Sequence, residues 1–217
     1  MATIKNVLFD FGGVIVDLDR EAAIGQFKKI GLDSVEEYLD PYRQRGFFSE
    51  FERGHINTEQ FYDNVRELVR KDVFDKDLFD KEIDRGWLAF LKPIDPARLQ
   101  FILDLHGSYR TYLLSNTNPI VMRWADSSDF TPARLPLRSY FNDLYLSYEL
   151  GCLKPEPEIF RKFIELSGVT PEETLYIDDS AENIEAGASF GFQTMLYGSN
   201  SSFEDIRREL ELASGKP

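Results

Sequence analysis

The chain has 217 residues, of which 42% are hydrophobic and 14% aromatic, and its formal net charge is −13. This length allows one large domain, or a domain with an inserted companion, and a sizeable core. The negative charge argues against nucleic acid and anionic membranes as main partners, because both select for Lys and Arg. A small phosphorylated ligand stays compatible, since lysine, a metal ion and helix N-termini bind phosphate locally.

Cys152 is the single cysteine, so no internal disulfide forms, and a small buried or near-surface residue is its expected role. The first residues enter a strand without the apolar run of a signal peptide, and no apolar stretch reaches membrane-spanning length. We therefore expect a soluble, cytoplasmic protein, with monomer and homodimer both open.

Residues 4–10 read as a buried strand whose apolar run ends at the carboxylate of Asp10, with Gly12 and Gly13 close behind. A strand that stops on a carboxylate places it at the carboxyl edge of a sheet, where α/β proteins carry out their chemistry. Glycines there let backbone N–H groups approach a bound anion. A plain turn after a strand explains this segment alone equally well.

Residues 17–91 read as an inserted helical block. Apolar residues recur at helical spacing in two segments, Ala22, Ala23, Ile24, Phe27 and Ile30 in the first and Phe61, Val65, Leu68 and Val69 in the second. Thr58 is a plausible N-cap for the second segment. An insertion after the first strand returns at both ends to the carboxyl edge of the sheet, which makes it a natural lid. We therefore predict a core domain of residues 1–16 and 92–217 and a helical cap domain of residues 17–91.

Strands and helices alternate in the rest of the chain. Helices are predicted over residues 96–106, 155–167, 181–190 and 203–212, and strands over residues 109–115, 144–147, 174–178 and 193–197. This alternation implies βαβ units and a parallel sheet, so the predicted fold class is α/β, a Rossmann-like doubly wound sheet. Residues 118–138 contain three prolines and read as a long irregular connection.

Three further segments place polar residues at strand ends or helix starts. Ser115 closes a strand, Lys154 precedes a proline-led helix start, and Asp178 and Asp179 end an apolar strand. Each of them also has a structural explanation when taken singly. Ser115 could be a helix cap, Lys154 a solvated lysine, and Asp179 or Ser180 the N-cap of the following helix. Two adjacent carboxylates repel each other, but a hard cation such as Mg²⁺ between them and Asp10 offsets that repulsion.

The ordered set of Asp10, Ser115, Lys154 and the pair Asp178 and Asp179 resembles the haloacid dehalogenase superfamily of aspartate-nucleophile hydrolases. The resemblance covers essentially the whole chain. It is strengthened by the strings Gly-x-x-Lys-Pro-Glu-Pro-x-Ile-Phe from residue 151 and Ile-Asp-Asp-Ser-x-x-Asn-Ile-Glu-Ala from residue 177. It implies a Rossmann-like core with an inserted helical cap of the C1 type.

The resemblance also implies a mechanism. Asp10 attacks phosphorus to form an aspartyl-phosphate, which water hydrolyses, and its ionised form is expected to need no pKa tuning at neutral pH. Mg²⁺ would bridge Asp10, the phosphate and Asp179, with Asp178 adjacent or acting through water and the backbone carbonyl of Gly12 as a further ligand.

Other groups are implied to hold the substrate. Lys154 would offset the repulsion between nucleophile and phosphate, while Ser115 and the N–H of Asn116 would hold phosphoryl oxygens, beside the loop of Gly12 and Gly13. In the cap, Arg53 could reach a phosphate or a sugar hydroxyl, and a structural ion pair is the alternative.

Gly12 departs from the pattern of most phosphatases of this superfamily, which carry there an aspartate that protonates the leaving oxygen. General acid catalysis is typically worth about 10²–10⁴-fold. Three explanations stay open. The leaving group, such as an anomeric hydroxyl or an acyl group, is good enough to leave without an acid. Alternatively, another carboxylate such as Asp17 or Glu52 of the cap substitutes for the missing acid, or the protein binds its ligand and turns over very slowly.

Several strings are similar to the bacterial α-D-glucose-1-phosphate phosphatase subgroup, whose members also have glycine at the acid position. They are Phe-Asp-Phe-Gly-Gly-Val-Ile-Val-Asp from residue 9, Glu-Arg-Gly-x-Ile from residue 52, Gly86-Trp87, and Leu-Ser-Asn-Thr-Asn from residue 114. The implied substrate is a sugar phosphate such as a hexose 1-phosphate. Trp87 could stack on a sugar, although core packing is the default for a tryptophan.

Three other functions are less consistent with the sequence. Dehalogenation needs no metal, and members of that branch lack the pair Asp178 and Asp179. A sugar phosphomutase must return the phosphoryl group to a hydroxyl, which Gly12 disfavours. A binding or regulatory protein has no need of the intact Asp10. The prediction is a Mg²⁺-dependent phosphatase acting on a small phosphorylated metabolite.

Overall fold

The computed structural model describes residues 2–40, 43–69 and 75–214. Its centre is a five-stranded sheet of order β3-β2-β1-β4-β5, in which every neighbouring pair is parallel. The strands are β1 (Asn6–Phe9), β2 (Arg110–Ser115), β3 (Asp143–Leu146), β4 (Thr174–Asp178) and β5 (Gln193–Leu196). Because the chain runs outward from β1 in both directions, the sheet is doubly wound, and the predicted fold class is confirmed.

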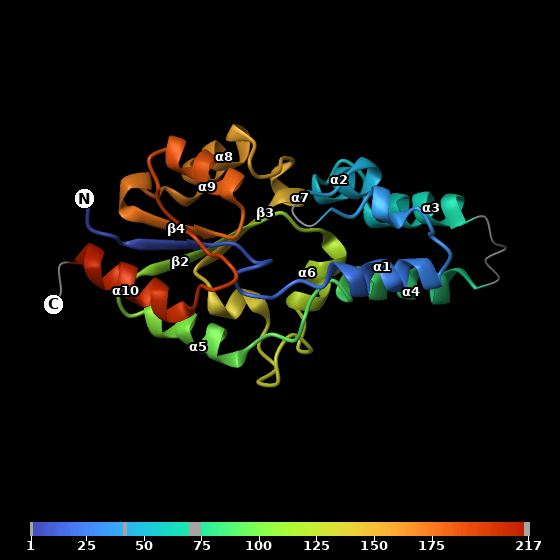
Figure 1. The fold of residues 1–217 in the computed structure, drawn as a ribbon, viewed down its shortest axis with the longest axis horizontal. Coiled ribbons are helices and arrows are strands. Elements are labelled where there is room, and N and C mark those ends of the chain that lie inside the picture. Colours follow the sequence, from blue (N-terminus) through green and yellow to red (C-terminus); the bar gives the residue numbers. More distant parts are fainter. Residues whose placement is uncertain (1, 41–42, 70–74, 215–217) are drawn as a thin grey trace.

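Helices cover both faces of the sheet. Figure 1 shows α8 (Pro157–Ser167) and α9 (Ala181–Ser189) on one face and α5 (Pro96–Leu105) and α10 (Phe203–Ser214) on the opposite face. Side chains of β1 alternate between the two: Leu8 belongs to the apolar cluster under α8, whereas Val7 and Phe9 belong to the larger cluster on the other side. Burial on both faces explains why Val7, Leu8 and Phe9 of β1 form an unbroken apolar run.

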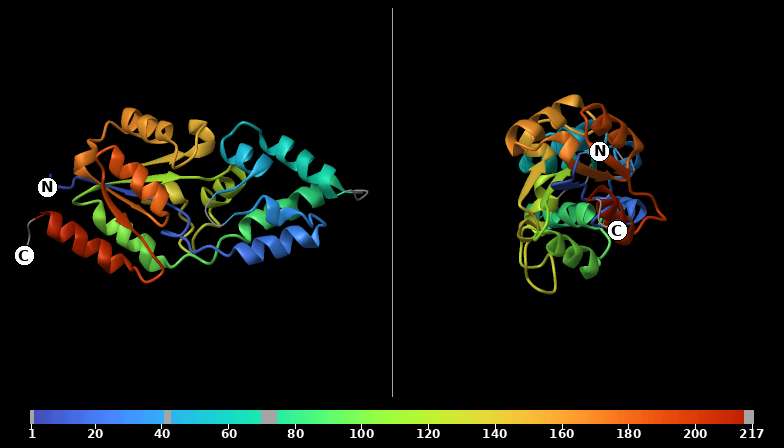
Figure 2. Two further views of the ribbon diagram at one scale, coloured as in Figure 1. Left: turned by 45° about the horizontal axis from the view of Figure 1, so that its top comes forward. Right: turned by 90° about the vertical axis from the view of Figure 1, so that its left-hand side faces the viewer.

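The helices that follow β1, up to α4, lie beyond the carboxyl end of the sheet (Figures 1 and 2). They are α1 (Arg20–Lys29), η1 (Val35–Glu37), α2 (Gly46–Glu52), α3 (Thr58–Val69) and α4 (Lys76–Leu88). We refer to this group as the cap; its division from the core as a separate domain stays a prediction.

Aromatic side chains hold the cap helices together. The rings of Phe51 and Phe61 stack with centroids 4.5 Å apart, and Phe48 meets Phe61 edge-on at 4.9 Å. Gly86 lets α4 approach α1, because a Cβ at this position would lie 2.6 Å from the Phe27 ring. The Gly86-Trp87 pair therefore has a packing role in this cluster.

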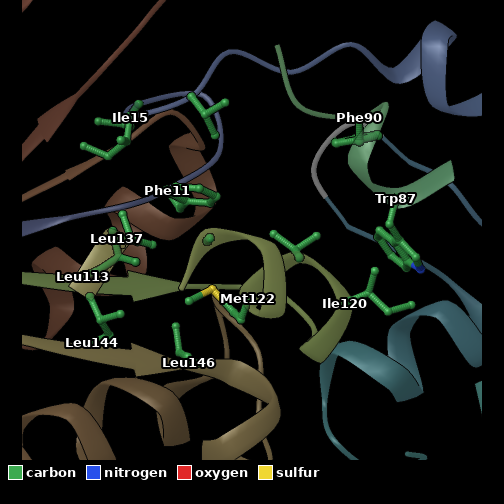
Figure 3. Close-up of a cluster of buried hydrophobic side chains, with 14 of the residues drawn as sticks. Phe11, Ile15, Trp87, Phe90, Leu113, Ile120, Met122, Leu137, Leu144 and Leu146 are labelled. Carbon is green, nitrogen blue, oxygen red and sulfur yellow. The ribbon is translucent and has the colours of Figure 1, made fainter. Parts of the chain in front are cut away.

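A continuous apolar cluster joins cap and core. Figure 3 shows Ile120 and Met122 of α6 (Pro119–Ala125) between Leu113 of the sheet and Trp87 of the cap. The cap therefore rests on the core through buried side chains as well as through its two connecting segments.

Two local predictions were wrong. Residues 118–138 are not irregular throughout: they contain α6, and η2 (Leu137–Tyr140) follows. The Oδ1 atom of Asn118 accepts from the N–H groups of Ile120 and Val121, both at 3.1 Å, and Pro119 occupies the first turn. Asn followed by Pro is a helix start, which the density of prolines in this segment obscured.

The N-cap of α3 is Asn57 and not Thr58. The Asn57 side chain accepts from the Gln60 N–H, and the Gln60 side chain accepts from the Asn57 N–H, both at 2.9 Å. This reciprocal pair is a capping box. Two short elements complete the fold, α7 (Ser147–Leu150) directly after β3 and η3 (Pro171–Glu173) before β4. Among the described residues, no helix has both the length and the apolar character needed to cross a membrane.

Candidate active site

Asp10 and Lys154 form a buried ion pair at the carboxyl end of β1. The Asp10 Oδ1 atom accepts from the N–H of Phe11 at 2.6 Å and lies 2.8 Å from the Lys154 Nζ atom. Asp10 is 8% exposed and Lys154 2%. The Lys154 ammonium also donates to Asp178 Oδ2 at 2.7 Å. One ammonium group is therefore held between two carboxylates, as expected if it is to act at a fixed point.

Asp178 is fully buried, and donors surround its carboxylate. Besides Lys154, the hydroxyl of Tyr176 donates to Oδ2 at 2.5 Å, while the backbone N–H of Ser180 and the side chain of Asn183 donate to Oδ1, both at 2.9 Å. These contacts make Asp178 an anchor for Lys154, and its role as a metal ligand stays a prediction. Sequence reasoning missed Tyr176, although a residue two before Asp178 on the same strand faces the same side.

Asp10, Asp178 and Asp179 offer carboxylate oxygens that all lie within 4.8 Å of one another. Gly13 makes the approach of Asp179 possible: its φ is +77°, and a Cβ there would lie 2.0 Å from Asp179 Oδ2. A cluster of hard oxygen donors of this kind suits Mg²⁺. The residues present therefore fit the predicted cation.

The raised pKa values of Asp179 and Asp10 also favour a bound cation at this cluster. Burial, followed by the charge of Asp178, raises the pKa of Asp179 to about 6. Burial also raises the pKa of Asp10, with Asp178 and Asp179 adding to the effect and Lys154 opposing it. Burial in the protein alone therefore opposes ionisation of Asp10, and the expectation that Asp10 needs no tuning stays a prediction for the site with its cation. A cation at the cluster favours the ionised carboxylates that the chemistry requires.

We expect Gly13→Ala to weaken Mg²⁺ binding by about tenfold or more, because its methyl group would displace Asp179 and its positive φ would be strained. The measurement is the rise in melting temperature on adding Mg²⁺, which should shrink in the variant. Gly151→Ala is the matched control, since Gly151 has a φ of +72° but a Cβ added there would have no heavy atom within 4 Å. An unchanged Mg²⁺ response in Gly13→Ala would contradict the assignment.

Asn116 clamps the backbone of Lys154. Its Oδ1 atom accepts from the Lys154 N–H at 2.8 Å and its Nδ2 atom donates to the Lys154 carbonyl at 3.0 Å. Ser115 is 2% exposed at the end of β2. The predicted contacts of Ser115 and of the Asn116 N–H with phosphoryl oxygens stay predictions, whereas the side-chain clamp is a role that sequence reasoning missed.

A cavity of about 90 Å³ lies between core and cap. Its lining includes core residues Asp10, Gly12, Ser115, Asn116, Lys154 and Asp179 and cap residues Gln44, Glu52 and Trp87. This volume is small beside the ~300–1,000 Å³ of typical ligand pockets. An adjoining pocket of about 710 Å³ shares Gln44 and Asp179 and is lined further by Arg43 and Arg45. Substrate would therefore enter by cap opening or extend into this second pocket.

Three predicted site residues lie outside the cavity lining. Gly13 and Asp178 lie behind it, supporting Asp179 and Lys154. Arg53 pairs through both guanidinium nitrogens with Glu156, at 2.9 Å for the Nη1–Oε2 contact. The structure favours the structural alternative for Arg53, whose partner lies in the core.

Residues 4–191 match the haloacid dehalogenase-like hydrolase family. The chain belongs to this family. It is therefore a hydrolase, as predicted from the order of the four strand-end motifs.

Individual relatives are similar over nearly the whole chain. The D-ribitol-5-phosphate phosphatase of Bacteroides thetaiotaomicron is 46% identical over 191 residues, covering 88% of this chain and 90% of the relative. A predicted HAD-like hydrolase from Porphyromonas gingivalis superposes with a TM-score of 0.88 at 36% identity, covering 96% of this chain and 98% of that one. A HAD family enzyme from Bacteroides thetaiotaomicron, solved with magnesium and inorganic phosphate, superposes with a TM-score of 0.84 at 39% identity, covering 94% and 98%.

Proposed function

We propose that this hydrolase is a Mg²⁺-dependent phosphatase that releases phosphate from a small sugar phosphate or polyol phosphate. The observation that carries the proposal is the meeting of Asp10, Lys154 and Asp179 in one cavity beneath the cap. The relative named as a ribitol-5-phosphate phosphatase and the relative solved with magnesium and phosphate support the reaction class.

In the proposed reaction, Asp10 attacks phosphorus and forms an aspartyl-phosphate, and a water molecule then releases inorganic phosphate. The Phe11 N–H and the Lys154 ammonium hold the Asp10 Oδ1 atom and so fix the orientation of the carboxylate. Lys154 reduces the repulsion between Asp10 and the phosphate, and Ser115 holds a phosphoryl oxygen. Mg²⁺, held by Asp10, Asp179 and the carbonyl of Gly12, would supply charge neutralisation.

Two unpaired donors support a substrate rich in hydroxyl groups. Trp87 Nε1 and Asn118 Nδ2 are buried without a hydrogen-bond partner among the described residues, and both residues line the cavity. Buried donors nearly always find a partner, so acceptors from a substrate are the natural complement. Hydroxyl and phosphoryl oxygens of sugar and polyol phosphates are such acceptors. Trp87 thus belongs both to the cap cluster and to the cavity.

The relative named as a ribitol-5-phosphate phosphatase widens the substrate class expected from the glucose-1-phosphate phosphatase subgroup. The ribitol-5-phosphate relative acts on the ester of a primary alcohol, which is a poorer leaving group than an anomeric hydroxyl. For such a substrate a good leaving group no longer explains Gly12. We therefore include hexose 1-phosphates and polyol phosphates in one substrate class.

A panel of phosphate esters tests this function. With Mg²⁺ present, kcat/KM should be at least about tenfold higher for ribitol 5-phosphate or a hexose 1-phosphate than for phosphoserine. The reason is that the unpaired donors of Trp87 and Asn118 favour esters with hydroxyl acceptors over esters without them by about 1–3 kcal/mol. A chelator should abolish activity on all of them. Tight binding of sugar phosphates without release of phosphate would contradict the proposal and favour a regulator. Formation of an isomeric sugar phosphate in place of inorganic phosphate would favour a mutase.

A further inference from the structure

We propose that Glu52, carried by the cap, donates to the leaving oxygen the proton that no residue at position 12 can supply. This proposal rests on the phosphatase function proposed above. The sequence leaves three explanations for Gly12 open: a good leaving group, a substitute acid and a weak enzyme. The proposal selects the substitute acid and assigns that role to Glu52.

Glu52 lines the cavity in which the proposed reaction takes place. It is the last residue of α2, is only 7% exposed, and lines the same cavity as Asp10, Lys154 and Asp179. In the part of the chain that the structure describes, no hydrogen-bond donor or cation contacts its carboxyl group. The neighbouring guanidinium of Arg53 is engaged by Glu156 and does not neutralise it.

The surroundings of Glu52 keep its carboxyl group protonated. A buried carboxyl group without a cation retains its proton, because ionisation in a poorly solvated place is costly. Burial and then the nearby charge of Asp10 raise the pKa of Glu52 to about 8. The other substitute acid considered, Asp17, does not line the cavity; its carboxylate is about half exposed and pairs with Arg98 at 2.8 Å.

Three consecutive residues dock this part of the cap onto the core. The hydroxyl of Ser147, which is fully buried, donates to the Glu52 carbonyl at 2.6 Å. Arg53 pairs with Glu156 at the start of α8. Gly54 has a φ of +69°, and a Cβ there would lie 2.1 Å from the carbonyl oxygen of Tyr148. These contacts join cap to core at Glu52 and at the two residues that follow it, so docking of the cap holds the acid at the cavity.

The proton balance closes over the two steps. As Asp10 forms its bond to phosphorus, the bond from phosphorus to the alcohol oxygen breaks and its electron pair takes the proton of Glu52. The alcohol leaves and Glu52 is a carboxylate. In the second step water attacks phosphorus, its proton returns to Glu52, and the bond from phosphorus to Asp10 breaks. Inorganic phosphate leaves, and both carboxyl groups regain their initial states.

The test compares esters whose leaving groups differ in their need for a proton. Ribitol 5-phosphate releases an alcohol and needs one, whereas p-nitrophenyl phosphate releases a stable phenolate. Both esters share the second step, in which Glu52 takes up the proton of water, so the readout is the release of the leaving group in a single turnover. Glu52→Gln should lower the rate of this release by about 10²–10⁴-fold for ribitol 5-phosphate and by less than about tenfold for p-nitrophenyl phosphate. Glu50→Gln is the matched control, because Glu50 lies on the same helix, is about half exposed and pairs with His55. It should leave both rates unchanged.

A rescue experiment separates an acid from a structural group. A Cβ at Gly12 would meet only the Leu18 side chain, at 3.2 Å, and φ there is not positive, so Gly12→Asp requires a small shift of a flexible side chain. In the Glu52→Gln background, adding Gly12→Asp should raise kcat for ribitol 5-phosphate by at least about tenfold over Glu52→Gln alone. The rise in melting temperature with Mg²⁺ should be the same in Glu52→Gln as in the wild type.

Two results would overturn this assignment. Equal losses in single-turnover release of both leaving groups in Glu52→Gln would mean that the residue binds or supports and does not donate a proton. Undiminished turnover of ribitol 5-phosphate would remove it from the reaction. In either case a wild-type enzyme that hydrolyses both esters keeps the phosphatase function intact, whereas a wild type that hydrolyses neither contradicts that function itself.

Discussion

Replacement of Asp10 by asparagine is expected to lower turnover by at least about 10⁴-fold while the protein stays folded. An amide is not nucleophilic enough to attack phosphorus, so no covalent intermediate can form. The fold should persist, because the asparagine oxygen can still accept from the Phe11 N–H, and the change removes one of three clustered negative charges. The measurement is kcat on ribitol 5-phosphate together with the melting temperature without metal.

Asp17→Asn is the control for this experiment. Asp17 belongs to the same loop but does not line the cavity, and its carboxylate pairs with Arg98 near the surface. Its replacement should change kcat by less than about threefold, as expected for an exposed ion pair. Near-normal turnover in Asp10→Asn would remove Asp10 from the mechanism.

Lys154→Met is expected to abolish activity and to lower the free energy of unfolding by about 3–5 kcal/mol. Burial alone would lower the pKa of the Lys154 ammonium, but Asp10 and Asp178 outweigh it and raise the pKa above its ordinary value. Without the ammonium both buried carboxylates lose their cation. Protonation at low pH would remove the buried negative charge that the missing ammonium no longer compensates. The stability lost should therefore shrink as the pH is lowered.

Chemical denaturation at two pH values checks this prediction. Lys5→Met is the control, because the Lys5 side chain is 63% exposed and its ion pair with Glu173 lies at the surface. That change should cost about 0–1 kcal/mol at either pH. A Lys154→Met variant as stable as Lys5→Met would mean that the ammonium does not hold the two aspartates in place.

The core of the site was predictable because each of its parts is local in the sequence. Asp10, Ser115 and Asp178 each end a short apolar strand, and parallel strands bring their carboxyl ends to one edge of the sheet. Lys154 follows from the same order of motifs. Their meeting at one edge of the sheet needed no knowledge of distant contacts.

The cap's contribution depends on contacts that no local pattern reveals. Arg53 could pair with a phosphate or with a carboxylate, and its partner Glu156 lies 103 residues away. Glu52 and Asp17 were equally good substitute acids until tertiary packing buried the first and left the second near solvent. The prediction at residues 118–138 was wrong for a different reason: a local helix start at Asn118 was outweighed by the number of prolines.

The central claim is that a divalent cation brings a phosphoryl group onto Asp10. Rapid acid quenching of the Mg²⁺-loaded enzyme during turnover of a substrate carrying radioactive phosphorus tests it most directly, followed by peptide mapping. We predict label on the peptide that contains Asp10, released by hydroxylamine as an acyl phosphate is, and none when Mg²⁺ is withheld. Full turnover with no labelled peptide, or with label on another residue, would contradict the account.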